Sequence, residues 1–431
     1  MLSSAELVKA LKLPESNIEL FESWNYTLLA SGKVLQSDSA LALTALEDNF
    51  IADKYPECSF RAELLAKLEL LAQKVRSNAA LRDYFVFCNA FMLRDLTLPG
   101  KGKPAMMPYL EEFLGREESR LFDILIYFGA VAQWFETFRK LGVPARYAAL
   151  PLESLPQTVE KFYKANGCYG YPRSSFHWLA HFINGELFRI GRFEYMVREA
   201  APWVPLAFRS NKTGQVVLMA RHNWKMLGNG LRLPLDEPFA KADYSTRLLM
   251  TDKFVRGTYI DPTGFAMLDK EITLDLEEFK PMWQPGQLTA EIHIPGGGGM
   301  TMERCQASLK EAREFFLKYF GWKTPFFWCV SWVFNPDIAA ELPESNIAEL
   351  QKRVYLAPRD STGDSGLGFV FGRSDGNWLD YPEETSLQRA FKRLITKGIP
   401  LKNGCMFIDD AGIDAFEVDF YRKNTINESE S

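Results

Sequence analysis

The sequence is poor in histidine and has no excess of positive charge. Its 431 residues include 4 histidines, and 50 lysines and arginines are outnumbered by 55 aspartates and glutamates, so the formal net charge is −5. Proteins dedicated to nucleic acids need a basic surface that attracts the phosphate backbone. We therefore expect no nucleic-acid partner.

Cysteines with the spacing of a metal site or a disulfide framework are also missing. The six cysteines are far apart and none belongs to a Cys-x-x-Cys pair, which indicates a reducing compartment. The N-terminus lacks the basic start and apolar core of a signal peptide, and the most apolar segment, residues 124–132, is too short to span a bilayer. These features predict a soluble, cytoplasmic protein with no membrane partner.

The residues that are present indicate a globular α+β protein with 47% hydrophobic and 14% aromatic residues. Residues 4–189 have helical periodicity almost throughout, for example in residues 60–75, with a Pro-Gly loop at 99–102. After Arg192 the chain is rich in β-branched and aromatic residues, which is typical of strands. We expect a helical domain over residues 1–190 and a mixed, β-rich part after it.

Predicted strands and helices alternate in the second part of the chain, as in α/β or α+β domains. The predicted strands are residues 216–220, 254–260, 288–294, 326–334 and 367–371. The predicted helices are residues 301–320, 338–353 and 386–397. We expect a β-rich middle section over residues 191–287, an α/β section over residues 288–423, and a polar, frayed tail over residues 424–431.

The clearest chemical signal is a predicted strand, a run of four glycines and a predicted helix. Residues 288–294 alternate between two faces, so Thr289, Glu291 and His293 share the face that we expect to be wet. Pro295 ends the strand, the glycines follow, and Thr301 is a plausible N-cap. Glycines at a helix start suit a phosphate or pyrophosphate, although a turn without a ligand is the alternative.

Glu291 and His293 are candidate catalytic residues. Two residues apart on one strand, their side chains can project into one cleft and accept a proton from an attacking amine. The alternative is that both side chains face solvent on a half-exposed sheet.

Other candidate groups are weaker. His177 and His181 have the spacing of a two-histidine metal site on a helix, but no third ligand is near in sequence, so we predict no metal. Cys305 lies early in the predicted helix, where the helix dipole favours a thiolate, whereas most buried cysteines only pack. Ser331 and Asp337 lack the histidine and the turn of a hydrolase triad.

At this point the sequence resembles a known family, the bacterial proteins that pair a helical N-acyltransferase N-terminal domain with a GNAT-like C-terminal domain. The resemblance covers most of the chain. The motifs that carry it are Leu187-Phe-Arg-Ile-Gly-Arg-Phe-Glu-Tyr195, Glu291-Ile-His-Ile-Pro-Gly-Gly-Gly-Gly-Met-Thr301, Cys329-Val-Ser-Trp-Val-Phe-Asn-Pro-Asp337, Leu342-Pro-Glu-Ser-Asn-Ile347, Phe369-Val-Phe-Gly372 and Thr385-Ser-Leu-Gln-Arg-Ala390.

The resemblance implies a GNAT-like fold for residues 288–423 and transfer of an acyl group from a coenzyme A thioester to an amine of a small molecule. The usual GNAT pyrophosphate signature, Gln/Arg-x-x-Gly-x-Gly/Ala, is absent, and the four glycines stand in its place. The residues expected to bind the coenzyme are Ile294, Gly296, Gly297, Gly298, Gly299 and Thr301.

Two alternatives stay open from the sequence. If residues 288–294 are the first strand of the GNAT-like sheet and not its central strand, the coenzyme loop would lie at residues 382–386, with Gln388 or Arg389 as the polar contact. The second alternative is a non-catalytic protein that binds a metabolite or another protein on the same scaffold, which the missing signature motivates.

Overall fold

A computed structural model describes residues 1–27, 36–92, 107–201, 203–233, 242–284, 286–373 and 377–423. The chain divides into two compact units, unit 1 at Met1–Ile190 and unit 2 at Gly191–Ser431. The predicted loop at residues 99–102 and the predicted frayed tail at residues 424–431 lie outside the described residues.

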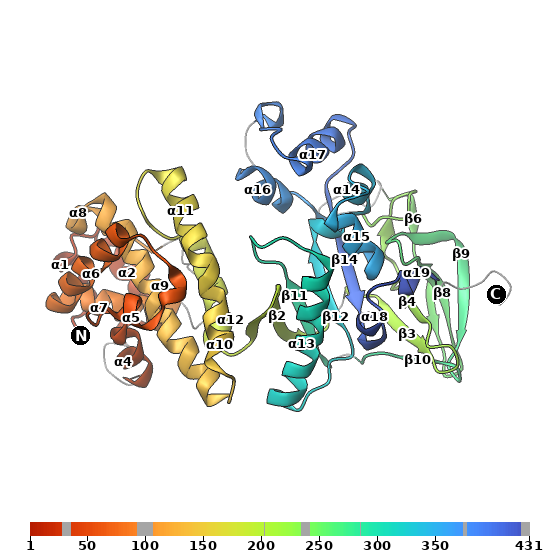
Figure 1. Cartoon of the computed structure of the whole chain (residues 1–431), viewed down its shortest axis with the longest axis horizontal. Helices are drawn as coiled ribbons and strands as arrows, with labels where there is room; N and C mark the ends of the chain where they lie inside the picture. Colours follow the sequence, from red (N-terminus) through yellow and green to blue (C-terminus); the bar gives the residue numbers. More distant parts are fainter. Residues whose placement is uncertain are drawn as a thin grey trace. The chain divides into compact units, whose positions relative to one another are not determined.

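Unit 1 is helical, as its apolar periodicity predicts (Figure 1). Its helices are α1 (Ser4–Ala10), α2 (Ser16–Ser23), α4 (Gln36–Thr44), α5 (Phe50–Lys54), η1 (Pro56–Cys58), α6 (Ala62–Ser77), α7 (Ala79–Phe87), η2 (Cys88–Met92), α8 (Glu111–Leu114), α9 (Arg116–Lys140), α10 (Ala145–Ala149), η4 (Leu150–Ser154), α11 (Leu155–Asn166), η5 (Arg173–Ser175) and α12 (Phe176–Ile183). The unit ends in strand β1 (Leu187–Ile190), so the expectation of helix up to residue 189 is wrong at its end.

Helix α9 forms the centre of unit 1. It is 25 residues long, and its middle turns are buried on every side. By length and composition it is the one helix among the described residues that could cross a membrane, and 83% of its apolar window is buried inside the protein. The apolar segment 124–132, which by itself is too short to span a membrane, is thus part of a longer helix. Buried helices in protein cores can have the same length and apolar composition as a membrane span.

Unit 2 contains most of the strands. These are β2 (Phe193–Glu199), β3 (Leu206–Ser210), β4 (Val216–Met219), β5 (Lys225–Met226), β6 (Tyr244–Ser245), β7 (Leu248–Met250), β8 (Phe254–Ile260), β9 (Ala266–Asp275), β10 (Phe279–Pro281), β11 (Leu288–His293), β12 (Phe327–Ser331), β13 (Tyr355–Thr362) and β14 (Lys402–Ile408). Its helices are α13 (Met302–Phe320), η7 (Trp332–Phe334), α14 (Pro336–Glu341), α15 (Asn346–Arg353), α16 (Ser365–Phe371), η8 (Trp378–Asp380), α17 (Ser386–Thr396), α18 (Asp410–Asp414) and α19 (Phe420–Lys423). The α+β class expected from the sequence is confirmed.

One sheet of unit 2 positions the strand and loop of interest. Its strands lie in the order β2, β11, β12, β14, β13. β11 runs antiparallel to β2 and parallel to β12. A parallel pair needs a crossover connection, and α13, which follows β11 and precedes β12 in the chain, supplies it. β11 is therefore an interior strand of the sheet, with β2 on one side and β12 on the other.

The second sheet of unit 2 has the order β10, β3, β4, β8, β7, with β9 paired to β8. Its own core includes Phe208, Met219 and Val255. Tyr355 of β13 links the two sheets, because its hydroxyl donates to the Ile260 carbonyl at 2.5 Å. A buried hydroxyl needs such a partner, so this bond fixes how the sheets pack.

Three predicted elements of unit 2 differ in the structure. Residues 338–353 form not one helix but α14 and α15, because Pro343 disfavours helical backbone at Leu342, which has φ −135° and ψ 61°. Residues 367–371 belong to helix α16 and not to a strand, since a short apolar run fits either structure. The strand expected over residues 326–334 ends at Ser331, whose hydroxyl accepts a hydrogen bond from Val333 N and starts η7.

Candidate functional site

The glycine loop between β11 and α13 has a backbone that other residues rarely adopt. Gly297, Gly298 and Gly299 have φ angles of 84°, 72° and 65°. A side chain is disfavoured at such angles, so the loop needs glycine at these three positions. All four glycines are exposed, and a Cβ on Gly296 or Gly299 would meet no atom within 4 Å. The space beside the loop is open.

Two arginines hold the carbonyl groups of this loop. Arg192 donates from Nε to the Gly299 carbonyl at 2.6 Å and from Nη1 to the Pro295 carbonyl at 2.9 Å. Arg304, in the first turn of α13, donates to the Gly298 carbonyl. The arginines therefore satisfy the carbonyls of Pro295, Gly298 and Gly299 and place two positive charges beside the loop.

The amide groups of the loop remain available. The N–H groups of Gly296 to Gly299 donate to no acceptor in the part of the chain that the structure describes. The helix that follows has Thr301 as its N-cap, as the sequence predicts, although the Thr301 side chain makes no capping hydrogen bond to the backbone. Free N–H groups at the start of a 19-residue helix attract anions, and the helix dipole adds to this effect.

The loop lies where two neighbouring strands separate. β11 and β12 pair at two positions only, Ala290 with Phe327 and Glu291 with Trp328. Beyond them β11 continues to His293 and β12 to Ser331 without pairing to each other. The carboxyl ends of the two strands thus diverge next to the glycine loop, at the edge of a sheet where ligands of α/β proteins usually bind.

Glu291 and His293 lie on one face of β11, as predicted, but Glu291 is not on a wet surface. Glu291 is 7% exposed and Thr289 is 0% exposed, because β11 is an interior strand with neighbours on both edges and packing on both faces. The Glu291 carboxylate accepts a hydrogen bond from Arg198 Nη1 at 2.5 Å, and His293 Nε2 is 3.8 Å from the same oxygen. The face contains a buried carboxylate next to a half-buried imidazole.

Aromatic and cationic side chains from distant segments extend this face. Trp328 donates from Nε1 to the Thr289 hydroxyl at 2.9 Å, and Trp203 packs edge-on against Trp328. The guanidinium of Arg359 lies 3.9 Å from the ring centre of Trp203. No local sequence pattern indicates Arg192, Arg198 and Arg359, since only the pairing of strands brings them to β11 and its loop.

The alternative coenzyme loop at residues 382–386 has its polar groups engaged. Thr385 and Gln388 form a reciprocal cap at the start of α17, with Gln388 N donating to Thr385 Oγ1 at 3.1 Å and Thr385 N donating to Gln388 Oε1 at 2.9 Å. Arg389 Nη1 donates to the carbonyls of Glu383 and Glu384. This helix start satisfies its own donors and leaves less for an anion.

Cys305 is buried against the sheet and does not favour the thiolate. Burial raises the pKa of its thiol to about 11, although Arg192 and Arg304 lower it. The expected effect of the helix dipole is therefore outweighed by desolvation. The packing interpretation of Cys305 fits the structure.

The two histidines of α12 are engaged separately. His177 Nδ1 lies 2.6 Å from the Ser174 carbonyl, and His181 Nδ1 lies 2.8 Å from Glu186 Oε2. The described ranges contain no group of three or more His, Cys, Asp or Glu side chains with the arrangement of a metal site.

Comparisons with protein families identify both parts of the chain. Residues 187–407 match the GNAT-like C-terminal domain, and residues 50–185 match the N-acyltransferase N-terminal domain. A search of curated proteins finds no match for this sequence.

Solved structures of acyltransferases have a similar fold over nearly the whole chain. One, in complex with decanoyl-CoA and teicoplanin, has a TM-score of 0.58 and 17% sequence identity, covering 95% of this chain and 99% of that one. Another, a mutant in complex with octanoyl-CoA, has a TM-score of 0.57 and 16% identity with the same coverage. A third, in complex with CoA and 10C-teicoplanin, has a TM-score of 0.58 and 16% identity, again with this coverage.

The GNAT-like match covers more than half of the 431 residues and includes β11, the glycine loop, α13 and the sheet strands on either side. The helical part before it carries the second match. The family resemblance read from the sequence is thus confirmed. The chain belongs to the acyltransferase family that has a GNAT-like C-terminal domain, here preceded by an N-acyltransferase N-terminal domain.

Proposed function

We propose that this protein transfers an acyl group from an acyl-CoA to an amine of a small-molecule acceptor. The observation that carries the proposal is the glycine loop, whose four amide N–H groups are unpaired at the start of α13. Related structures bound to octanoyl-CoA, decanoyl-CoA and teicoplanin support this choice of donor and acceptor class.

The glycine loop is the proposed site for the pyrophosphate of the donor. Gly296, Gly297, Gly298 and Gly299 would donate their N–H groups to it, and Ile294 and Thr301 flank them at the end of β11 and the start of α13. Arg192 and Arg304 add positive charge beside the loop. A nest of backbone N–H groups and a helix start together suit a phosphate group.

Glu291 is the proposed proton acceptor for the amine. The nitrogen attacks the thioester carbonyl and forms a tetrahedral intermediate, and its proton passes to Glu291 directly or through water. The C–S bond then breaks, the amide remains on the acceptor, and coenzyme A leaves as the thiolate, which takes up a proton from the site and becomes the free thiol. His293, at 3.8 Å from Glu291, is placed to assist this proton transfer.

Titration of the purified full chain with acetyl-CoA, octanoyl-CoA and decanoyl-CoA tests the coenzyme site. The variant Gly297→Asp, Gly298→Asp places negative charge in the loop, and we expect it to lose binding. A matched control is Gly214→Asp, Gly398→Asp, because both glycines also have positive φ angles, 75° and 69°, and open space around them. The control corrects for backbone strain and added charge.

The outcomes separate the proposal from its alternatives. Binding that survives in the loop variant would move the coenzyme site, and residues 382–386 would be tested next. If no acyl-CoA binds the wild type, the protein is the non-catalytic metabolite- or protein-binding member of the family. Release of free thiol in the presence of an amine library then tests transfer itself. A cytoplasmic location and a bacterial source remain part of the proposal.

A further inference from the structure

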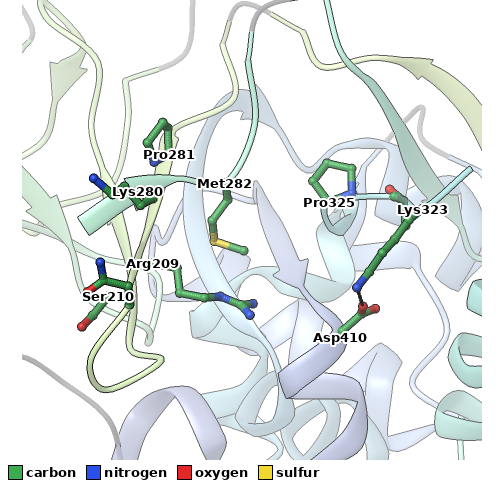
Figure 2. Close-up of a pocket in the computed structure, with 10 residues that line it drawn as sticks. Arg209, Ser210, Lys280, Pro281, Met282, Lys323, Pro325 and Asp410 are labelled. Carbon is green, nitrogen blue, oxygen red and sulfur yellow. Dashed lines mark ion pairs between the residues drawn. The ribbon is translucent and has the colours of Figure 1, made fainter. Parts of the chain in front are cut away.

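Unit 2 has a cavity that none of the glycine-loop residues lines (Figure 2). It has a volume of about 370 Å³, within the range of sites for small ligands. Its walls come from the end of β3, from β10, from the segment before β12 and from the start of α18. The lining residues are Arg209, Ser210, Asn211, Lys280, Pro281, Met282, Lys323, Thr324, Pro325 and Asp410.

This cavity lies at the amino end of β12, whereas the glycine loop lies at the carboxyl end of β11. Lys323, Thr324 and Pro325 precede β12, whereas the glycine loop follows the carboxyl end of the parallel strand β11. The two ends of a strand of five or six residues are about 17 Å apart. A ligand in the cavity would therefore not contact the loop or Glu291.

The lining has an excess of positive charge. The lining includes three cationic residues, Arg209, Lys280 and Lys323, and one acidic residue, Asp410. Lys323 Nζ lies 3.0 Å from Asp410 Oδ2, and the Lys323 side chain is 73% exposed. Lys280 Nζ donates to the Leu276 carbonyl at 2.6 Å. Both ammonium groups have further donors for an anion, since each carries three N–H groups.

Arg209 is held in place by a buried carboxylate. Its guanidinium pairs with Asp409, whose side chain is 3% exposed. Asp409 Oδ1 also accepts hydrogen bonds from Gly412 N at 2.9 Å and from the Tyr421 hydroxyl at 2.7 Å. The Arg209 side chain is 36% exposed, and Figure 2 shows it extending into the cavity. A guanidinium fixed from behind and open in front is preorganised for an anion.

We infer that this cavity binds a compact anion with two negative charges, a dicarboxylate or a phosphate, at a site separate from acyl transfer. Arg209 would bind one end of the anion through its planar fork, and Lys280 and Lys323 would neutralise the rest. Pro281, Met282 and Pro325 provide an apolar wall for the carbon part of the ligand.

Calorimetric titration of the full chain with inorganic phosphate and with succinate tests the inference. Coenzyme A is present in excess so that the glycine loop does not contribute, and the Gly297→Asp, Gly298→Asp variant is titrated in parallel. We expect at least one of the two anions to bind at one site per chain, both in the wild type with coenzyme A and in the loop variant. Phosphate alone or succinate alone identifies the class of anion.

The variant Lys280→Gln, Lys323→Gln should weaken binding about tenfold, because two charged donors are lost. Lys253→Gln, Lys310→Gln is the matched control, since both of these lysines are exposed and lie outside the cavity. Arg209→Lys keeps a positive charge for Asp409 and should also weaken binding.

Two results would overturn the inference: neither anion binds the wild type, or the cavity variant and the control bind equally well. The titration of the loop variant does not depend on coenzyme A binding. The test of the cavity therefore still applies if the proposed acyl transfer fails.

Discussion

The hydroxyl oxygens of Tyr195 and Ser308 lie 2.9 Å apart, and this contact joins strand β2 to helix α13. Ser308 also accepts a hydrogen bond from Phe193 N at 3.3 Å. A Cβ on Gly191 would lie 3.2 Å from Ser308, so the backbone at this glycine approaches the helix closely. The helix that begins at the glycine loop is thereby fixed against the sheet.

Replacement of Tyr195 by phenylalanine should lower the free energy of unfolding by about 1 kcal/mol, the usual net value of a buried hydrogen bond. Urea unfolding measures it. A double-mutant cycle with Ser308→Ala isolates the pair, and strictly additive effects would show that the two hydroxyls do not interact.

Removal of the Arg192 side chain should disturb the glycine loop without changing its sequence. In Arg192→Met the carbonyls of Pro295 and Gly299 lose their donors, and we expect acyl-CoA binding to weaken about tenfold. Calorimetric titration gives the dissociation constant. Lys310→Met, an exposed change on α13, is the control. An unchanged constant in Arg192→Met would exclude a role for this arginine in shaping the loop.

Glu291→Gln should lower kcat by about 10² or more and leave acyl-CoA binding unchanged. Glutamine keeps the size of the side chain and a hydrogen-bond acceptor for Arg198, but it cannot take a proton from the amine. Thiol release with an amine acceptor measures the rate. Glu199→Gln on the neighbouring strand is exposed and serves as the matched control. Full activity in Glu291→Gln would remove this residue from the mechanism.

Cys305 should not form an acyl intermediate. Burial raises its pKa to about 11, so the thiol is neutral at pH 7.5 and iodoacetamide should not modify the folded protein. The raised pKa contributes stability that is present below about pH 8.5, the unfolded value, and is lost as the pH rises through about 11. The Cys305→Ala variant should retain the transfer rate of the wild type, measured by thiol release. Loss of activity in this variant would support an acyl intermediate on Cys305.

A buried ion pair stabilises unit 1. Arg173 donates from Nε and Nη2 to Asp123 Oδ1 at 2.9 and 2.8 Å, and the side chains are 3% and 0% exposed. Asp123→Asn leaves the guanidinium without its counter-charge and should cost about 3–5 kcal/mol in unfolding free energy. Thermal and urea unfolding measure it. The double variant Asp123→Leu, Arg173→Met removes both charges and should recover most of the loss, whereas an equal loss would point to packing instead.

Local sequence patterns predicted the helices and strands correctly where the pattern fits only one type of secondary structure. The β-branched and aromatic residues at 254–260 coincide with β8, and the helix predicted over residues 301–320 coincides with α13. Periodicity failed at residues 367–371, where a short apolar run fits a strand as well as the helix that forms. Periodicity also misses the break at Leu342, because the helical pattern continues past Pro343 although the proline disfavours helical backbone at the residue before it.

The glycine loop, the strand before it and the helix after it can be predicted from the sequence, because glycine backbone freedom, period-two alternation and helical periodicity are local properties. The surroundings of that loop depend on residues that are distant in sequence. Arg192 reaches Gly299 across 107 positions of sequence, and Arg198 reaches Glu291 across 93. Strand pairing also buried Glu291, since the number of neighbours on each side of a strand depends on the whole sheet and not on the strand's own residues.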